Sequence, residues 1–314
     1  MDKLPKPMPL VALTGATGFI GRYLLKELPR RGYRLRVLLR RPSTMPLEYA
    51  SAIVGDLARP QNMSAALADV DAIIHSAGVT RAVSGMPDDD YRTLNTEATI
   101  ALARAAERAG TKRFVFLSSI RAQAGPSADR ILNEELEAKP TDAFGRSKLA
   151  AEQGLAQLGI DWVALRPPLV YGPGVKANFE RLLRLARSPY PLPFGALNGR
   201  RSLLSIDNLV DVIEAVLSFP GPLKRPYIVA DNEQLTVSEM ITAKRHGLRR
   251  HPRLVSFPLA MLETMLKVTG RPDWYERLAG SLVVDASALK ALGWVPRIST
   301  PAGLAMLAGD IATP

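Results

Sequence analysis

Three glycines spaced three residues apart, Gly15, Gly18 and Gly21, follow an apolar run at residues 10–13 and open a helix-like stretch at 19–28. A strand that turns sharply into a helix needs one glycine at the turn itself. A second glycine lets a pyrophosphate approach the backbone, and a third lets the helix pack closely on the strand. The helix N-terminus then directs free N–H groups and a positive dipole end at the phosphates. Three glycines alone are a weak signal, but the strand before them and the helix after them favour dinucleotide binding.

The second expected strand, residues 34–39, is followed by Arg40 and Arg41 rather than by a carboxylate. In NAD-binding folds an Asp or Glu near this point holds the ribose 2′-hydroxyl. Two guanidinium groups suit a 2′-phosphate instead, because they form charge-assisted hydrogen bonds to phosphate oxygens. A pair of solvated surface arginines is the ordinary alternative. Their position at the strand end favours NADP(H), with NAD(H) as the second choice.

Strands and helices are expected to alternate along the first half of the chain. Apolar runs lie at residues 10–13, 34–39, 53–54, 72–75 and 113–117, and helical periodicity is clearest at 91–109. This alternation predicts an α/β fold with a doubly wound parallel sheet of the Rossmann type. Pro and Gly become frequent after residue 166, so we expect a dinucleotide-binding domain over 1–166 and a smaller substrate-binding region over 167–314. That C-terminal region is expected to be interleaved, with some segments returning to the core of the first domain.

Composition narrows the function classes. The 314 residues hold 41 Lys and Arg against 30 Asp and Glu, a formal charge of +11. No basic run interleaved with aromatics appears, which argues against nucleic acid, and phosphate-bearing ligands account for part of the excess. There is no cysteine and the three histidines lack metal-ligand spacing, so neither thiol chemistry nor a metal is expected. No signal-peptide pattern precedes the first expected strand and no apolar stretch reaches about 18 residues, so we expect a cytoplasmic protein without membrane insertion.

Further motifs follow the expected strands in order: Gly55-Asp-Leu57, His75-Ser-Ala-Gly78, Asn95 in Leu-Asn-Thr-Glu, Phe114-Val-Phe-Leu-Ser-Ser119, Arg166-Pro167 and Val170-Tyr-Gly-Pro173. With Thr14-Gly-Ala-Thr-Gly-Phe-Ile-Gly21, this set resembles the extended short-chain dehydrogenase/reductase family from about residue 9 to about residue 308. Within it, the stretches 166–178 and 199–208 resemble bacterial UDP-sugar 4-epimerases and UDP-4-keto-6-deoxy-N-acetylhexosamine 4-reductases.

The resemblance implies a cofactor site. Its residues are Gly15, Thr17, Gly18, Phe19, Ile20, Gly21, Arg40, Arg41, Asp56, Leu57, Ser76, Ala77, Gly78, Lys148 and Pro167. The Asp56 carboxylate follows the third strand, where it can accept a hydrogen bond from the adenine amino group. We interpret His75 as an orienting or packing residue rather than an acid–base catalyst.

The resemblance also implies a catalytic set in which a tyrosine, four residues before a lysine, gives or takes the proton of a sugar hydroxyl. A serine upstream forms a hydrogen bond to the same sugar oxygen. Ser119 and Lys148, 29 residues apart, fit the serine and the lysine, and Asn95 completes the set. The position four before Lys148 is Phe144, which keeps the ring but has no proton to transfer.

Three explanations for Phe144 remain open at this point. It is an engineered change that traps substrate, a natural loss that leaves a binding protein, or a site where another group moves the proton less efficiently. Ser119 with a water is the candidate for that group. Losing a positioned general acid costs about 10²–10⁴-fold in rate.

The second half of the chain supplies the substrate-binding candidates. The resemblance implies that Arg201 holds the pyrophosphate of a UDP-sugar, and Asn178, at the start of an expected helix, can offer its amide to the same group. Arg271 and Arg277 are candidates for a second phosphate clamp, with solvated surface arginines as the alternative. It also implies a homodimer through helices at 91–109 and 144–158. The small residues that permit close approach there are Ala98, Ala101, Ala105, Ala150 and Ala151.

Two functions follow. The first is an NADP(H)-linked enzyme that moves a hydride to or from C4 of a UDP-hexose, once as a 4-keto reductase or out and back as a 4-epimerase. The second is a non-catalytic NADP(H)-binding sensor or assembly subunit of the same fold. A phosphate clamp has little use in a sensor that binds no sugar nucleotide, so the sequence favours the enzyme.

Overall fold

The computed structural model describes residues 8–42, 49–80, 87–268 and 272–307 of the chain. These residues form two units, each discontinuous in sequence. Unit 1 comprises Met1–Ala122, Pro140–Arg166 and Val210–Tyr227. Unit 2 comprises Gln123–Lys139, Pro167–Leu209 and Ile228–Pro314.

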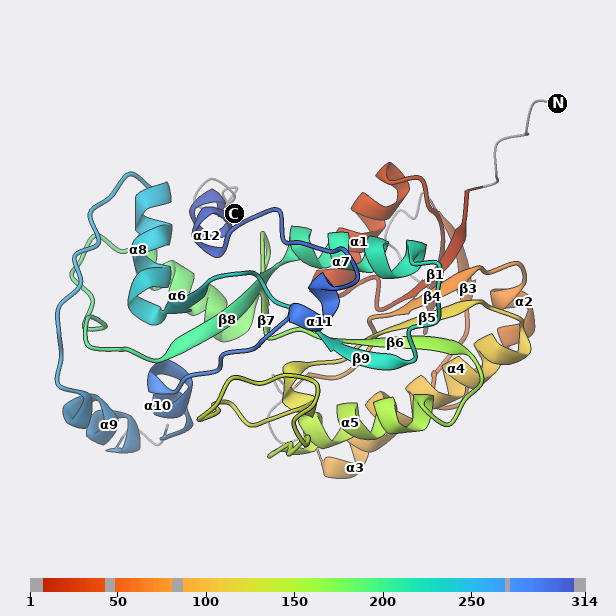
Figure 1. Cartoon of the computed structure of the whole chain (residues 1–314), viewed down its shortest axis with the longest axis horizontal. Coiled ribbons are helices and arrows are strands. Elements are labelled where there is room, and N and C mark those ends of the chain that lie inside the picture. The colour runs from red at the N-terminus through yellow and green to blue at the C-terminus, as the bar shows by residue number, and fades with distance from the viewer. Residues whose placement is uncertain (1–7, 43–48, 81–86, 269–271, 308–314) are drawn as a thin grey trace. The chain divides into compact units, whose positions relative to one another are not determined.

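Unit 1 is built on a seven-stranded sheet in the order β3-β2-β1-β4-β5-β6-β9 (Figure 1). The strands are β1 (Leu10–Thr14), β2 (Arg34–Leu39), β3 (Ala50–Ile53), β4 (Ala72–His75), β5 (Arg113–Leu117), β6 (Asp161–Arg166) and β9 (Arg225–Ile228). β1 pairs in parallel with β2 on one side and β4 on the other. The strand order therefore reverses beside β1, which is where doubly wound folds bind their ligands.

Helices cover both faces of this sheet, with α1 and α7 on one face and α4 and α5 on the other (Figure 1). The helices of this part of the chain are α1 (Phe19–Arg30), α2 (Met63–Leu67), α3 (Asp88–Tyr91), α4 (Ala98–Arg108), α5 (Ala143–Leu155) and α7 (Ile206–Ser218). Every residue of β1, β4 and β5 is buried, as parallel strands covered on both faces require. The predicted Rossmann-type parallel sheet is confirmed.

The helices expected at 91–109 and 144–158 have different boundaries in the structure. The first divides into α3, a π-helical segment η1 at Arg92–Glu97, and α4. The wider turn carries Asn95, and single π turns within helices are common at functional sites. The second helix, α5, ends at Leu155, and the N–H groups of Gln157 and Leu158 bond to carbonyls only three residues earlier. The N–H groups of Gly159 and Ile160 then bond to the Glu107 carboxylate.

Unit 2 combines a three-stranded sheet with helices. Its sheet has the order β10-β8-β7, made from β7 (Leu169–Tyr171), β8 (Arg200–Ser205) and β10 (Gln234–Thr236). The helices are α6 (Ala177–Arg187), α8 (Val237–Gly247), α9 (Leu259–Val268), α10 (Pro272–Ala279), α11 (Ser287–Lys290) and α12 (Thr300–Met306). A capping box between Thr236 and Glu239 starts α8.

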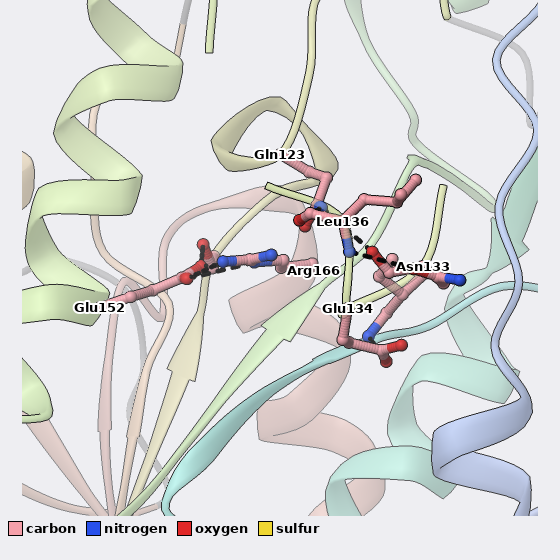
Figure 2. A network of polar contacts seen from close by, with 8 residues as sticks. Gln123, Asn133, Glu134, Leu136, Glu152 and Arg166 are labelled. Atoms are coloured by element: carbon pink, nitrogen blue, oxygen red, sulfur yellow. Dashed lines mark hydrogen bonds and ion pairs between the residues drawn. The ribbon is translucent and has the colours of Figure 1, made fainter. Parts of the chain in front are cut away.

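The loop at residues 123–139 also belongs to unit 2. Figure 2 shows that Gln123 connects two parts of this loop, because its side-chain amide donates to the carbonyl of Leu136 at 2.7 Å.

A buried carboxylate organises the core of unit 2. Asp231 accepts hydrogen bonds from the Tyr171 hydroxyl at 3.0 Å, the Asn208 amide at 2.7 Å and the Ser205 backbone at 3.1 Å. Burial, together with the charge of Asp231, raises the pKa of Tyr171 far above its ordinary value. Tyr171 is therefore a structural phenol that stays protonated, and it is unsuited to replace the acid missing at Phe144.

His75 lies in the core of unit 1 at 1% exposure. Its two ring nitrogens contact the hydroxyls of Thr14 at 2.7 Å and Thr99 at 3.0 Å. Burial, and secondarily the positive charge of Lys148, lower the pKa of the His75 imidazole to about 3. The ring is neutral at physiological pH and packs between its partners.

The free energy of unfolding should therefore fall as the pH drops from 6.5 towards 3, because the unfolded chain binds a proton that the folded His75 excludes. Between pH 7 and pH 4.5 this group alone should remove about 2–3 kcal/mol. Urea unfolding measured at pH 7 and at pH 4.5 gives the loss of unfolding free energy on acidification. In His75→Asn this loss should be about 2–3 kcal/mol smaller than in the parent chain. The exposed His251→Asn control should show the full loss. An unchanged pH dependence in His75→Asn would contradict the assignment.

Candidate active site

The turn from β1 into α1 needs glycine at two positions. Gly15 has φ +71°, and a Cβ there would lie 2.6 Å from the backbone nitrogen of Ala77. A Cβ on Gly21 would lie 2.1 Å from the carbonyl oxygen of Gly15. Within the described structure no side chain caps α1 and no acidic residue occupies its first turn. The helix N-terminus is thus available to an anion.

A cavity of about 530 Å³ lies at the carboxyl end of β1, β2 and β4. Its lining includes the predicted cofactor residues Gly15, Thr17, Arg40, Arg41, Asp56, Leu57, Ala77 and Gly78. The glycine turn and both strand-end arginines therefore meet in one place, and both arginines are exposed. Among the described residues, the other predicted cofactor positions do not line this cavity: Gly18, Phe19, Ile20, Gly21, Ser76, Lys148 and Pro167.

Most of those other positions support the cavity wall. Gly18, Phe19, Ile20 and Gly21 form the start of α1. The Ser76 hydroxyl donates to the carbonyl of Thr14 at 2.9 Å, which fixes the end of β4 against β1. The Asp56 carboxylate accepts from the backbone of Ala58 at 3.0 Å, so it shapes its own turn while lining the cavity. Pro167 directly follows β6 and is buried.

Gly78 links the cofactor cavity to the predicted catalytic residues. It lines the cavity, and a Cβ on it would lie 2.9 Å from the Asn95 side-chain oxygen and 3.3 Å from Lys148 Nζ. Asn95 is fully buried and clamps Val79 by accepting from its N–H at 2.8 Å and donating to its carbonyl at 3.0 Å. Its amide also donates to the Ser147 hydroxyl at 3.0 Å. Asn95 thus positions the segment that follows β4, through its two bonds to Val79.

The Lys148 side chain reaches the end of β5. Its ammonium donates to the carbonyl of Leu117 at 2.9 Å and lies 4.5 Å from the centroid of the Phe116 ring. Burial lowers the pKa of the Lys148 ammonium to about 8, against the opposing effect of the Glu152 carboxylate. Ser119 follows Leu117 by two residues and is half-buried, and its hydroxyl oxygen accepts from the backbone of Arg121 at 3.1 Å. The fold thus brings Lys148 and Ser119 to the same strand end.

A buried ion pair that the sequence analysis missed includes Glu152, whose negative charge favours the charged form of Lys148. Figure 2 shows Glu152 on α5 reaching Arg166 at the end of β6, with both side chains at most 5% exposed. The second Glu152 contact is the Ser118 hydroxyl, at 2.5 Å. Glu152 stands four residues after Lys148, and an acid at that helical spacing from the predicted catalytic lysine is the signal that could have placed Glu152 beside it.

Phe144 occupies the first turn of α5 beside the aromatic ring of Tyr91. The two ring centroids are 6.5 Å apart at an interplanar angle of 65°, an edge-to-face contact. Asp142 caps the helix by accepting from the backbone of Gly145 at 2.8 Å, and it also pairs with Arg121 at 2.6 Å. The ring at 144 is therefore held in a defined place one helical turn before Lys148.

The predicted phosphate-binding residues belong to unit 2, whereas Ser119, predicted to contact the sugar, belongs to unit 1. Asn178 in the first turn of α6, Arg201 on β8 and Arg277 on α10 line one cavity of about 650 Å³, together with Trp274. The Arg201 guanidinium donates to the carbonyls of Pro126 at 3.2 Å and of Glu276 at 3.1 Å. Arg271, the remaining candidate, lies outside the described residues.

Comparison with known proteins identifies the family of the chain. The model of the NAD dependent epimerase/dehydratase family matches residues 11–230. A Vibrio cholerae protein named UDP-glucose 4-epimerase is 33% identical over 304 residues, 94% of this chain and 92% of that protein. A ceramide reductase from Caulobacter vibrioides is 29% identical over 255 residues, 79% of this chain and 74% of that protein. The structure of MoeE5 in complex with UDP-glucuronic acid and NAD is similar with a TM-score of 0.74 and 25% identity, over 94% of this chain and 96% of that chain. The chain belongs to the NAD dependent epimerase/dehydratase family, a group of extended short-chain dehydrogenases/reductases.

Proposed function

We propose that the protein is an NADP(H)-linked nucleotide-sugar oxidoreductase or epimerase that acts at C4 of a UDP-hexose. The observation that carries this proposal is the position of Gly78, which lines the dinucleotide cavity and lies beside Lys148. A lysine held at that wall is placed to bind the nicotinamide ribose. The similarity to UDP-glucose 4-epimerase and to MoeE5, whose structure holds UDP-glucuronic acid, supports the sugar-nucleotide substrate.

The chain's own residues divide the chemistry among them. A bound nicotinamide cofactor supplies or accepts the hydride. Lys148 holds the ribose, and below pH 8 its positive charge stabilises negative charge on the sugar oxygen. Ser119 donates a hydrogen bond to that oxygen, since its own oxygen already accepts from Arg121. Phe144 supplies no proton, so Ser119 with a water transfers it, at a rate below that of a tyrosine.

For cofactor choice, Arg40 and Arg41 are the supporting feature. Both are exposed at the wall of the dinucleotide cavity, where no structural ion pair of theirs appears among the described residues. A 2′-phosphate would give them a partner. A preference for NADP(H) favours the reductase, because a net reduction draws on NADPH, while NAD(H) remains an accepted cofactor.

The substrate clamp is proposed from unit 2. Arg201 and Asn178 take the pyrophosphate, aided by the N-terminus of α6, and Arg277 with Arg271 takes a second phosphate. Trp274 and Phe179 offer aromatic surface to a base within the same cavity.

The apolar wall of the unit 2 cavity favours a second substrate class. Most of the cavity is lined by aliphatic and aromatic side chains, among them Leu169, Leu182, Leu185, Phe194, Met240 and Leu278. A long-chain alcohol or ketone fits such a wall, and the ceramide reductase among the relatives supports it.

Turnover assays on a panel of UDP-hexoses, their 4-keto forms and long-chain ketones separate these functions. We expect slow, NADP(H)-dependent conversion of a UDP-sugar. Conversion of the long-chain ketone alone would favour the second class. Cofactor binding without binding of any substrate would support the sensor.

A homodimer is proposed through α4 and α5, which pack on each other in unit 1. Ala101 on α4 and Ala150 on α5 remain partly exposed, so a second copy can approach them closely. Light scattering at micromolar concentration should give twice the 34.1 kDa chain mass. Ala101→Arg should give a monomer, whereas the exposed control Ala68→Arg should stay dimeric. A monomeric parent chain would contradict the proposal.

A further inference from the structure

Two segments of unit 2 contain no carboxylate. Residues 181–206 and 240–262 hold ten Lys and Arg between them and no Asp or Glu. The fold lays parts of them side by side: Leu192 N–H donates to the carbonyl of Arg253 at 3.0 Å, and Val255 N–H donates to the carbonyl of Leu192 at 3.0 Å. Positive charge that is dispersed in the sequence is therefore concentrated on one part of unit 2.

This part of the surface is both basic and apolar. We define the basic–apolar face as Arg184, Leu185, Arg187, Tyr190, Arg249, Arg250, Arg253 and Val255. Its apolar members are unusually exposed: Tyr190 is 72% accessible, Val255 52% and Leu185 46%. Arg184 has an acidic partner in Glu180, at 2.7 Å, and both side chains are exposed. Within the described residues, the other four arginines of the face form no ion pair.

A structural role accounts for only part of this charge. Arg245, which is 1% exposed, closes the C-terminus of α6 by donating to the carbonyls of Ala186, Ser188 and Tyr190. Burial and the positive charges of Arg250 and Arg253 lower the pKa of Arg245, so these cations repel one another. Arg250 and Arg253 bond to nearby carbonyls as well, but their charge remains uncompensated.

Arg187 and Arg249 have no such role. Neither side chain donates a hydrogen bond to any described residue. Crowding them onto a surface that is already positive costs stability, and a ligand of opposite charge would recover that cost. The exposed Tyr190 and Val255 beside them add a preference for an apolar phase.

We propose that the basic–apolar face docks on a bilayer surface that contains anionic phospholipids. Arginines pair with headgroup phosphates, and Tyr190 sits at the level of the headgroups, where an amphipathic ring is favoured. The proposed contact is with the bilayer surface, and no helix in the described part of the chain is long and apolar enough to cross a bilayer. This inference is independent of the proposed catalytic function.

Flotation of the full chain with vesicles tests it. The protein should float with vesicles of equal parts phosphatidylglycerol and phosphatidylcholine, and it should remain unbound with phosphatidylcholine alone. Raising the salt from 0.1 M to about 0.5 M should release it, because exposed charges are then screened. Failure to float with the anionic vesicles at low salt would overturn the proposal.

Variants locate the contact. Each cation near an anionic surface contributes about fivefold to binding, so Arg187→Gln/Arg249→Gln should weaken vesicle binding about 25-fold. Arg187→Lys/Arg249→Lys should retain it, which shows that charge rather than folding was lost. The matched control Lys26→Gln/Lys290→Gln removes two exposed charges elsewhere and should bind like the parent. Equal loss in this control would overturn the proposal.

Tyr190→Ser separates a bilayer from another polyanion. It should weaken vesicle binding several-fold, because the ring that contacts the headgroup region is lost. Any weak binding of duplex RNA to the arginines should stay unchanged. Tight binding of duplex RNA that depends on Arg187 and Arg249, without vesicle binding, would overturn the bilayer proposal in favour of a nucleic acid.

Discussion

Phe144→Tyr should raise turnover of a UDP-4-hydroxy or UDP-4-keto sugar by about 10²-fold or more. The substitution adds one oxygen to a ring whose place is already fixed by α5 and by the edge of Tyr91. Lys148 stands one helical turn away, and its charge should lower the pKa of the new phenol towards working pH. A positioned acid would then replace the slower transfer through Ser119 and water.

The pH dependence of this variant follows from Lys148. The pKa of its ammonium is about 8, so the positive charge is present below that pH and lost above it. Turnover of Phe144→Tyr should therefore decline above pH 8, where the phenol loses its electrostatic support. Phe219→Tyr, a half-buried phenylalanine of unit 1 outside the cofactor cavity, is the matched control and should leave turnover unchanged.

Cofactor and UDP binding should barely change in Phe144→Tyr, because Lys148 and the proposed phosphate clamp are untouched. If the variant binds both ligands and still fails to accelerate the reaction, the proposed catalytic set is wrong. If the parent chain already turns over at ordinary enzyme rates, another acid exists, and Ser119→Ala is the variant to measure next.

Arg40→Ala/Arg41→Ala should weaken NADP(H) binding about 10²-fold and change NAD(H) binding less than about twofold. Each charge-assisted hydrogen bond to a phosphate is worth about 1.5–3 kcal/mol, and only the 2′-phosphate distinguishes the two cofactors. Fluorescence titration of both reduced cofactors provides the two dissociation constants.

The matched control is Arg104→Ala, an exposed arginine of α4 that does not line the dinucleotide cavity. It should bind both cofactors like the parent. Tighter binding of NAD(H) than of NADP(H) by the parent, unaffected by the double substitution, would contradict the proposed preference.

Local signals predicted the sheet and the glycine turn well. Apolar runs and the contact of Gly21 with the Gly15 carbonyl involve close neighbours in sequence, so their structural meaning can be read from a short window. The π-helical turn at Asn95 could not be predicted in this way. It depends on a bond between the Asn95 side chain and Val79, 16 residues earlier in the chain.

Long-range pairing limited the prediction of the site as well. The Arg201 guanidinium donates to two backbone carbonyls, of Pro126 and Glu276, which are each 75 residues away in sequence, and a short sequence window does not reveal these bonds. The spacing from Lys148 places Glu152 near the site, but two charged residues that are 14 apart in sequence do not indicate that Glu152 pairs with Arg166 in the buried interior. The basic–apolar face depends on two segments that meet only in the folded chain.

Transfer of deuterium from the sugar to the cofactor tests the proposed hydride chemistry most directly. UDP-hexose labelled with deuterium at C4 would be incubated with the chain and NADP⁺, in parallel with Phe144→Tyr, and the cofactor would be analysed by mass spectrometry. A net oxidation should place deuterium in the nicotinamide ring, whereas an epimerase should return it to C4 of the epimerised sugar. We expect one of these two products, formed slowly with the parent chain and about 10²-fold faster with Phe144→Tyr. Binding of both ligands with neither deuterium in the cofactor nor conversion of the sugar at C4, in either protein, would contradict hydride transfer at C4.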